Sequence, residues 1–255
     1  MEYTVITGAC GGLGQAFCRI YAKEKESLLI TGRSQVKLEA LQKQLMEEYQ
    51  ISVRIKVCNL SNLNETQQFC EELKSLSVKR LINNAGIGTY GLFEQEKIST
   101  LLDIHQINMT SLMMLIHAVI PNMNKSGGEI LNVASTAAFQ PGPMMSVYYA
   151  SKSYVLSLSE ALWAELIHSN IKVSVLCCGP MNTEFASKAK LKHTWMQKLL
   201  MISVDDAALL AKKGLASGKR CIVPGTLNKM AVFISKYLPD SLLIRLMAYV
   251  QSKRK

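Results

Sequence analysis

No apolar run in the sequence approaches the length of a membrane span, which needs about 20 consecutive apolar residues. The seven cysteines are scattered without a repeated spacing, which argues against a disulfide framework. A reducing compartment is therefore expected, and we predict a cytoplasmic protein. The first three residues lead directly into a predicted strand, so we expect no secretory signal. No spacing of cysteine and histidine typical of a zinc site occurs, so we expect no metal.

Acidic residues are few beside basic ones, 19 against 29, which gives a formal net charge of +10. A basic surface attracts nucleic acid, anionic lipid or acidic ligands. No nucleic-acid-binding module is recognisable in the sequence, so we expect no nucleic-acid partner. The interpretation that fits best is a solvated basic surface that also accepts a polyanionic cofactor.

Short apolar runs alternate with helical patterns along most of the chain. This alternation predicts right-handed βαβ units, and therefore an α/β fold with a parallel, doubly wound sheet of seven strands flanked by helices. A chain of 255 residues, 49% of them apolar, is long enough for one such domain. We expect the domain over residues 1–225, with 226–255 as an amphipathic helical extension of it. Strands are predicted at 3–7, 27–31, 52–57, 80–83, 128–134, 171–177 and 220–223, and helices at 12–24, 34–49, 61–75, 97–122, 147–169 and 204–217.

The predicted strand at 3–7 runs into a glycine-rich turn that opens an apolar-periodic helix. Glycines let the backbone approach a ligand closely, and a helix N-terminus presents free N–H groups and a positive dipole end to an anion. The spacing is Gly8-x-x-x-Gly12-x-Gly14, which differs from the Gly-x-Gly-x-x-Gly fingerprint. A plain strand-to-helix turn is the alternative, but the pattern favours a pyrophosphate site.

Tyr148 and Lys152 lie four residues apart, and Ser135 lies thirteen residues before Tyr148. Neighbours at i and i+4 meet on one face of a helix. An ammonium beside a phenol lowers the pKa of the tyrosine from its usual value of about 10. Such a tyrosine can exchange a proton with an alcohol or a carbonyl near neutral pH. A surface helix with an ordinary tyrosine and a solvated lysine is the alternative reading of this pair alone.

Taken together, these motifs resemble the classical branch of the short-chain dehydrogenase/reductase family. The glycine loop runs from Thr7 to Gly14, and Asn83-Asn84-Ala85-Gly86 and the segment from Cys178 to Thr183 match two further motifs, so the resemblance covers residues 1 to about 225. It implies a Rossmann domain whose catalytic residues are Asn108, Ser135, Tyr148 and Lys152. It also implies cofactor contacts from Gly8, Gly11, Gly12, Leu13, Gly14, Asn59, Leu60, Asn84, Ala85, Gly86, Tyr148, Lys152, Pro180, Met181 and Thr183.

Two positions depart from the family pattern. Cys178 stands where the family has a proline, and Asn59 stands where an acidic residue usually lies near the adenine. An asparagine amide both donates and accepts hydrogen bonds, so we expect adenine binding to persist. The glycine spacing also satisfies Gly-x-x-Gly-x-x-Gly of a longer, epimerase-type branch, but the short chain, the Asn-Asn-Ala-Gly motif and the serine-to-tyrosine spacing argue against that branch.

The end of the second predicted strand indicates which cofactor is used. NAD-binding folds place an acidic side chain there to accept hydrogen bonds from the ribose hydroxyls. In this sequence the position is Gly32, followed by Arg33, with Lys37 nearby. A guanidinium suits a 2′-phosphate by charge and by geometry, so the sequence predicts NADP(H).

The resemblance implies hydride transfer between the nicotinamide and a carbonyl or alcohol carbon. Residues 181–202 break the alternation and occupy the place of the family's substrate lid. The predicted pocket is apolar and rich in methionine, which suits a hydrophobic ketone, aldehyde or secondary alcohol of steroid-like, bile-acid-like or fatty acyl-like form. A non-catalytic NADP-sensing or membrane-surface scaffold protein is the alternative. The candidate lining residues are Ala137, Phe139, Met144, Met145, Tyr149, Met181, Phe185 and Trp195.

The predicted helix at 101–122 is apolar over most of its circumference. A helix of that kind must be covered on both sides, and the family resemblance implies pairing with a symmetry mate, so we expect a homodimer or homotetramer. The extension at 226–255 is interrupted by Pro239 and ends in Lys253-Arg254-Lys255. Its apolar face has three possible destinations, in decreasing order of preference: its own domain, a second subunit or an anionic membrane surface.

Overall fold

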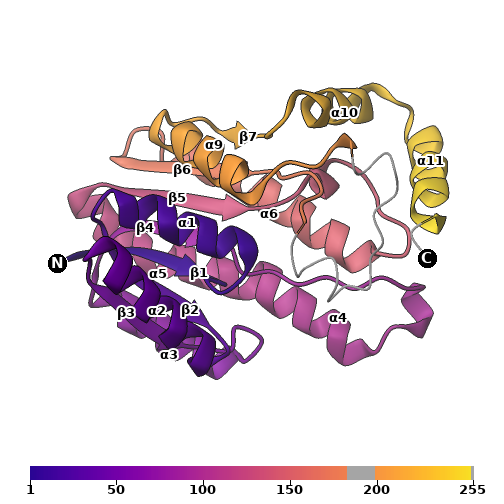
Figure 1. The fold of residues 1–255 in the computed structure, drawn as a ribbon. Coiled ribbons are helices and arrows are strands. Elements are labelled where there is room, and N and C mark those ends of the chain that lie inside the picture. Colours follow the sequence, from indigo (N-terminus) through magenta and orange to yellow (C-terminus); the bar gives the residue numbers. More distant parts are fainter. Residues whose placement is uncertain (183–198, 254–255) are drawn as a thin grey trace.

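The computed structural model describes residues 1–182 and 199–253 (Figure 1). Within those ranges, seven parallel strands form one sheet in the order β3-β2-β1-β4-β5-β6-β7. The order reverses between β1 and β4, which creates a crevice beyond the carboxyl ends of these strands, where such folds bind ligands. The strands are β1 (Glu2–Thr7), β2 (Ser27–Gly32), β3 (Val53–Val57), β4 (Ser77–Asn83), β5 (Gly128–Val133), β6 (Ile171–Leu176) and β7 (Cys221–Ile222).

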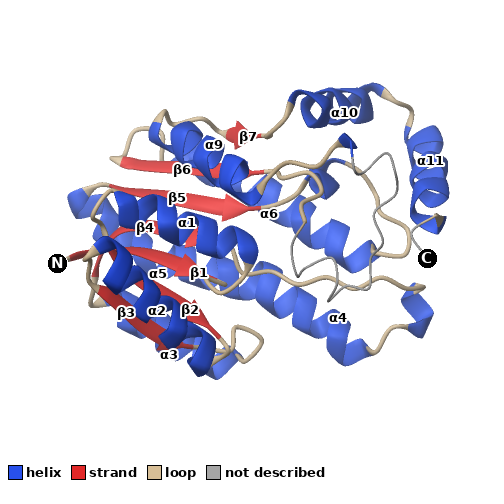
Figure 2. Ribbon diagram, in the orientation of Figure 1, coloured by secondary structure: helices blue, strands red, loops and turns tan. Residues whose placement is uncertain are grey.

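Helices cover both faces of the sheet, as the sequence predicts (Figure 2). One buried core joins a face of the sheet to α1, α2 and α9, and a second core joins the other face to α3, α5 and α6. The domain is therefore a three-layer Rossmann-like fold. The helices are α1 (Gly12–Lys23), α2 (Gln35–Tyr49), α3 (Leu63–Lys74), α4 (Ile98–His105), α5 (Leu112–Ser126), α6 (Ser146–Glu165), α9 (Val204–Ala216), α10 (Thr226–Tyr237) and α11 (Asp240–Ser252).

The helix predicted over 97–122 is present, and the chain is helical from Ile98 to Ser126, but it is not α-helical throughout. A π-helical segment, Gln106–Ser111, separates α4 from α5. Single π-helical turns within longer helices occur frequently at functional sites. Asn108 lies in this segment, and its side chain is held from two directions by Ile87 and Ser151. These tertiary contacts fix the local change in helix geometry, and periodicity alone carries no sign of it.

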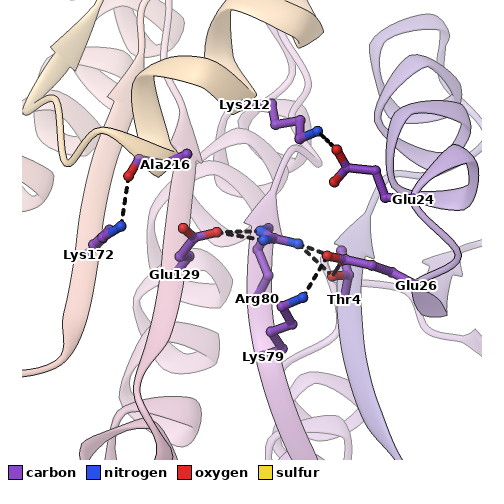
Figure 3. A network of polar contacts seen from close by, with 9 residues as sticks. All are labelled: Thr4, Glu24, Glu26, Lys79, Arg80, Glu129, Lys172, Lys212 and Ala216. Carbon is purple, nitrogen blue, oxygen red and sulfur yellow. Dashed lines mark hydrogen bonds and ion pairs between the residues drawn. The ribbon is translucent and has the colours of Figure 1, made fainter.

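The amino ends of the central strands are joined by a buried ion-pair network (Figure 3). Arg80 on β4 pairs with Glu26 at 2.5 Å and with Glu129 on β5 at 2.6 Å, and its guanidinium lies 4.3 Å from the ring centroid of Tyr21. Thr4 on β1 donates to the same Glu26 carboxylate. Buried charges need such pairing, because an unpaired buried charge is costly. The network thus joins β1, β4 and β5 at the end of the sheet opposite the crevice.

The C-terminal helices lie beyond the carboxyl ends of the strands, with α11 at the far right of Figure 1. Leu243 and Met247 of α11 are buried against Ala137, Met145 and Tyr148. Of the three destinations expected for this segment, its own domain therefore covers one face of α11. No helix within 1–182 or 199–253 is long and apolar enough to cross a membrane. The described residues also form no cluster of three or more potential metal ligands.

Candidate active site

The glycine loop is closely packed against the end of β4. Gly8 has a positive φ of 62°, and a Cβ atom there would lie 2.9 Å from the Cα of Ala85. A Cβ atom at Gly14 would collide with the carbonyl oxygen of Gly8. The loop can therefore fold so tightly only with glycine at both positions, and the turn opens directly into the N-terminus of α1.

Hydrogen bonds join this loop to the Asn-Asn-Ala-Gly motif. The hydroxyl of Thr7 accepts from the backbone N–H groups of Asn84 at 3.0 Å and Ala85 at 2.9 Å. In return, the side-chain amide of Asn84 donates to the carbonyl oxygens of Thr7 at 2.9 Å and Gly8 at 3.1 Å. Two motifs that lie 77 residues apart in the sequence are thus joined into one rigid wall of the crevice.

A cavity of about 880 Å³ occupies the crevice. Its wall includes most of the predicted cofactor residues, and the catalytic candidates Ser135, Tyr148 and Lys152 line it as well. Thr183, Phe185 and Trp195 lie outside the described residues. The predicted cofactor residues in the wall, besides Tyr148 and Lys152, are Gly8, Gly11, Gly12, Leu13, Gly14, Arg33, Leu60, Asn84, Ala85, Gly86, Pro180 and Met181.

Asn59 differs from the other predicted cofactor residues. Among the described residues, its neighbour Leu60 lines the cavity but Asn59 does not. The side-chain oxygen of Asn59 accepts from the backbone N–H of Ser61 at 3.3 Å and from the Ser61 hydroxyl at 3.0 Å. This side chain therefore organises the turn that leads to α3, and a contact with adenine stays a prediction.

Ser135 follows the end of β5, and Tyr148 and Lys152 lie one turn apart on α6. The Ser135 hydroxyl accepts from the backbone N–H of Ala137 at 3.1 Å and donates to the carbonyl oxygen of Cys178 at 3.3 Å. Lys152 Nζ lies 5.8 Å from the ring centroid of Tyr148. The structure thus brings the three predicted catalytic side chains to one end of the cavity.

Lys152 is buried, and its ammonium group donates to the carbonyl oxygen of Val133 at 2.8 Å. Burial disfavours the charged form and lowers the pKa of Lys152 from 10.5 to about 8. At neutral pH this group is still mostly protonated. A positive charge is therefore present beside the phenol of Tyr148.

Asn108 lies just behind the cavity wall. Its side-chain oxygen accepts from the backbone N–H of Ile87, and its amide donates to the carbonyl oxygen of Ile87 and to the hydroxyl of Ser151, each at 2.9 Å. Ser151 in turn donates to the carbonyl oxygen of Tyr148 at 2.7 Å. A Cβ atom at Gly86 would lie 3.3 Å from Lys152 Nζ and 3.4 Å from the side-chain oxygen of Asn108. Asn108 thus connects the π-helical segment to the turn of α6 that carries Tyr148.

The opposite end of the cavity is cationic. Gly32, Arg33 and Lys37 line it where β2 ends, and the Arg33 side chain is exposed. Gly32 has no side chain, so no acidic group at this position can accept hydrogen bonds from the ribose hydroxyls of a cofactor. The tight glycine loop, the open N-terminus of α1 and these two cations suit an anionic dinucleotide.

The sequence analysis did not identify the C-terminal helices as part of the site. Of the predicted pocket residues, Ala137, Met145, Tyr149 and Met181 line the cavity. Among the described residues, Phe139 and Met144 do not, so these two predictions were wrong. Lys236 Nζ lies 5.3 Å from the ring centroid of Phe139, and Met144 occupies a turn with a φ of 66°. The amphipathic pattern of residues 226–252 indicates an apolar face, but it does not indicate which part of the protein this face packs against. The cavity residues from α10, α11 and the turn between them are Ala231, Ile234, Ser235, Leu238, Leu243, Leu246, Met247 and Val250.

Comparison with known proteins shows which proteins this chain is similar to. The family model described as short chain dehydrogenase matches residues 2–194, well over half of the chain. Hydroxysteroid dehydrogenase-like protein 1 from Gallus gallus is 32% identical over 223 residues, which are 86% of this chain and 67% of that protein. Very-long-chain 3-oxoacyl-CoA reductase from Kluyveromyces lactis is 32% identical over 185 residues, 68% of this chain and 53% of that protein. A Homo sapiens relative named Inactive hydroxysteroid dehydrogenase-like protein 1 is 26% identical over 201 residues, 76% of this chain and 61% of its own length.

Solved structures give the same picture of the fold. A short-chain dehydrogenase from Sphingobium yanoikuyae in complex with NADPH is 27% identical, with a TM-score of 0.82 over 94% of this chain and 96% of that one. A short chain dehydrogenase/reductase from Burkholderia phymatum in complex with NAD has a TM-score of 0.80 over 91% of this chain and 92% of that one. At 22% identity, the second likeness concerns the fold alone.

Proposed function

The chain belongs to the short chain dehydrogenase family, whose members are oxidoreductases with nicotinamide cofactors, and from that premise we propose that it is an NADP(H)-dependent enzyme that interconverts a carbonyl and an alcohol. The observation that carries the proposal is the cavity, which has the glycine loop and Arg33 at one end and Ser135, Tyr148 and Lys152 at the other. Carbonyl reduction is the proposed direction, because a cytosolic NADP pool is kept reduced.

The preference for NADP(H) rests on the end of β2. An acidic side chain at the Gly32 position would favour the free ribose hydroxyls of NAD. Arg33 and Lys37 line this end of the cavity instead, and a guanidinium forms strong, charge-assisted hydrogen bonds with a phosphate. When it is bound, the cofactor supplies the hydride, and the protein supplies position and electrostatics.

We assign the proton transfer to Tyr148, which donates its hydroxyl proton to the oxygen of the reduced carbonyl. The nearby Lys152 ammonium stabilises the phenolate that remains. The hydroxyl of Ser135 donates a hydrogen bond to the substrate oxygen. This hydroxyl accepts from the backbone N–H of Ala137, and its proton forms a long, 3.3 Å hydrogen bond to the carbonyl oxygen of Cys178, which a substrate oxygen can replace. Asn108 positions the proton relay, as the family resemblance implies, and its side chain hydrogen-bonds to the backbone of Ile87 and to the hydroxyl of Ser151, the residue before Lys152.

The substrate proposed is a hydrophobic ketone, aldehyde or secondary alcohol of steroid-like, bile-acid-like or fatty acyl-like form. The substrate end of the cavity is lined by aliphatic and methionine side chains from Met145, Met181 and the C-terminal helices. Such walls suit a bulky apolar ligand. The names of two relatives, one hydroxysteroid dehydrogenase-like and one a very-long-chain 3-oxoacyl-CoA reductase, belong to the same range of substrates.

A panel of steroid, bile-acid and long-chain ketones and of small aldehydes, monitored by the absorbance of NADPH, tests this proposal. We expect oxidation of NADPH with at least one bulky apolar ketone and weaker activity with small aldehydes. Tight NADPH binding without turnover on any member of the panel would favour the alternative, a non-catalytic NADP-binding protein. The human relative whose name includes the word inactive gives that alternative a specific basis.

A further inference from the structure

The outer sides of α10 and α11, beyond the carboxyl edge of the sheet, both carry exposed apolar side chains. We call it the C-terminal apolar face and define it by Leu227, Met230, Phe233, Tyr237, Leu242 and Tyr249. The three aromatic side chains are 62%, 74% and 63% exposed, respectively. On α10 these groups gather: the ring centroids of Phe233 and Tyr237 lie 4.7 Å apart, and Met230 and Phe233 line a common hollow. Exposed apolar groups that gather rather than scatter singly mark an interaction site.

Helical spacing shows that this face is separate from the surface that packs on the domain. On α11, Leu243, Met247 and Gln251 are spaced by four and are buried. Leu242 and Tyr249, spaced by seven, lie on a second side of the same helix and are exposed. A helix that is apolar on two sides needs a partner on the second side as well.

The border of the face is cationic. Residues 226–255 contain six basic residues and one acidic residue. Lys229 and Lys236 are spaced by seven on α10, and both are exposed. On α11, Lys253 Nζ lies 5.3 Å from the ring centroid of Tyr249. Basic side chains bordering exposed aromatic and aliphatic groups are typical of helices that lie in the headgroup region of a bilayer.

The wall of the active-site cavity reaches this face at α10. Ile234 lines the cavity and also lines a separate, smaller hollow together with Lys229, Met230 and Phe233 on the exposed side of α10. A partner bound to the C-terminal apolar face would therefore lie beside one wall of the cavity.

We propose that the C-terminal apolar face docks on an anionic membrane surface, with the aromatic side chains inserted at headgroup level and the lysines paired with lipid phosphates. Long lysine side chains can reach the headgroups while their stems cover apolar surface. A two-fold contact with a second copy would bring two cationic borders together, whereas an anionic bilayer complements both the apolar and the basic part. Docking would place the α10 wall of the cavity beside apolar molecules dissolved in the bilayer, and this last point rests on the proposed function.

Cosedimentation of the full-length protein with vesicles tests the docking without cofactor or substrate. Vesicles of phosphatidylcholine alone are compared with vesicles in which about a third of the lipid is phosphatidylserine. We expect binding to the anionic vesicles and at least tenfold weaker binding to the neutral ones. The triple variant Phe233→Ser, Tyr237→Ser, Tyr249→Ser should lose binding at least tenfold, and Lys229→Gln with Lys236→Gln should lose most of the preference for anionic lipid.

The matched controls lie on α2, at the opposite edge of the sheet. Val36 is 76% exposed and Lys43 is also exposed, so Val36→Ser removes an exposed apolar group and Lys43→Gln an exposed cation away from the face, and both should leave vesicle binding unchanged. Unchanged circular dichroism and melting temperature establish that each variant is folded. Absence of vesicle binding by the wild-type protein, or equal binding by the triple variant, would overturn the proposal.

Sedimentation velocity without lipid distinguishes the remaining occupant. If the wild-type protein binds neither kind of vesicle but is oligomeric, and the triple variant is monomeric, then a second copy of the chain covers the face. Turnover of a small water-soluble ketone is measured in parallel, because the three aromatic residues do not belong to the described cavity wall. Lost vesicle binding with retained turnover separates this proposal from the proposed function.

Discussion

The side-chain amide of Gln251, near the end of the last helix, donates to the hydroxyl of Tyr149 at 2.6 Å. Tyr149 adjoins Tyr148, and the two rings meet edge to face with centroids 6.0 Å apart. The backbone carbonyl of Gln251 accepts from the hydroxyl of Tyr90 at 2.6 Å. One fully buried residue therefore fastens α11 to the start of α6 and to the loop that follows β4.

Replacing Gln251 by leucine removes the amide and leaves the Tyr149 hydroxyl without this buried donor. We expect α11 to pack less firmly, which should raise KM for a bulky ketone severalfold while the dissociation constant of NADPH stays unchanged. Steady-state kinetics and fluorescence titration measure the two quantities. Ser252→Ala, at the exposed neighbouring position, is the control. An unchanged KM, or an equal weakening of NADPH binding, would contradict this role of the helix.

Replacing Arg33 by alanine tests the choice of cofactor. A charge-assisted hydrogen bond contributes about 1.5–3 kcal/mol, so the affinity for NADPH should fall roughly 10- to 150-fold while that for NADH changes little. Calorimetric titration with both cofactors measures the difference. Arg220→Ala, which removes an exposed guanidinium 3.5 Å from Glu160, is the control. Equal affinities of the wild-type protein for NADPH and NADH would rule out the assignment.

The pKa of Lys152 predicts a specific pH dependence of stability. This pKa is about 8 in the folded protein, where the side chain is buried, and 10.5 when the side chain is exposed to water, as in the unfolded chain. The unfolded chain therefore holds this proton more tightly. The charge therefore destabilises the fold below pH 8, and the penalty disappears as the pH rises from 8 to 10.5, by about 3 kcal/mol in all. Compared with Lys152→Met, the wild-type protein should gain free energy of unfolding between pH 7 and 10. Urea titrations of both proteins measure this, and parallel profiles would refute it.

Helices α4 and α5 carry exposed apolar residues that a second subunit could cover. Most apolar residues of α4 and α5 are buried, but Ile98, Leu102 and Met113 are exposed. We expect a homodimer or homotetramer at micromolar concentration, with these residues in the interface, so Met113→Glu should shift sedimentation toward the monomer. Val36→Glu on α2 is the control. A monomeric wild-type protein would contradict the prediction.

The sequence predicts the fold well because each strand is a short apolar run bounded by polar or glycine-rich turns. It also predicts that Ser135, Tyr148 and Lys152 lie together, since helix periodicity joins two of them and the end of β5 supplies the third. It does not predict the π-helical segment around Asn108, which is held by contacts from residues 21 and 43 positions away. The same holds for α10 and α11, because an amphipathic pattern identifies an apolar face without saying what it packs against.

Turnover of the Tyr148→Phe variant tests the central claim most directly. The substitution keeps the ring and removes only the hydroxyl, so folding and NADPH affinity should persist. Loss of a general acid lowers the rate by a factor on the order of 10²–10⁴, and we expect kcat to fall by that much on the best ketone of the panel. Tyr149→Phe, the neighbouring control, should keep kcat within severalfold of the wild-type value. Near-normal turnover of Tyr148→Phe would contradict the account.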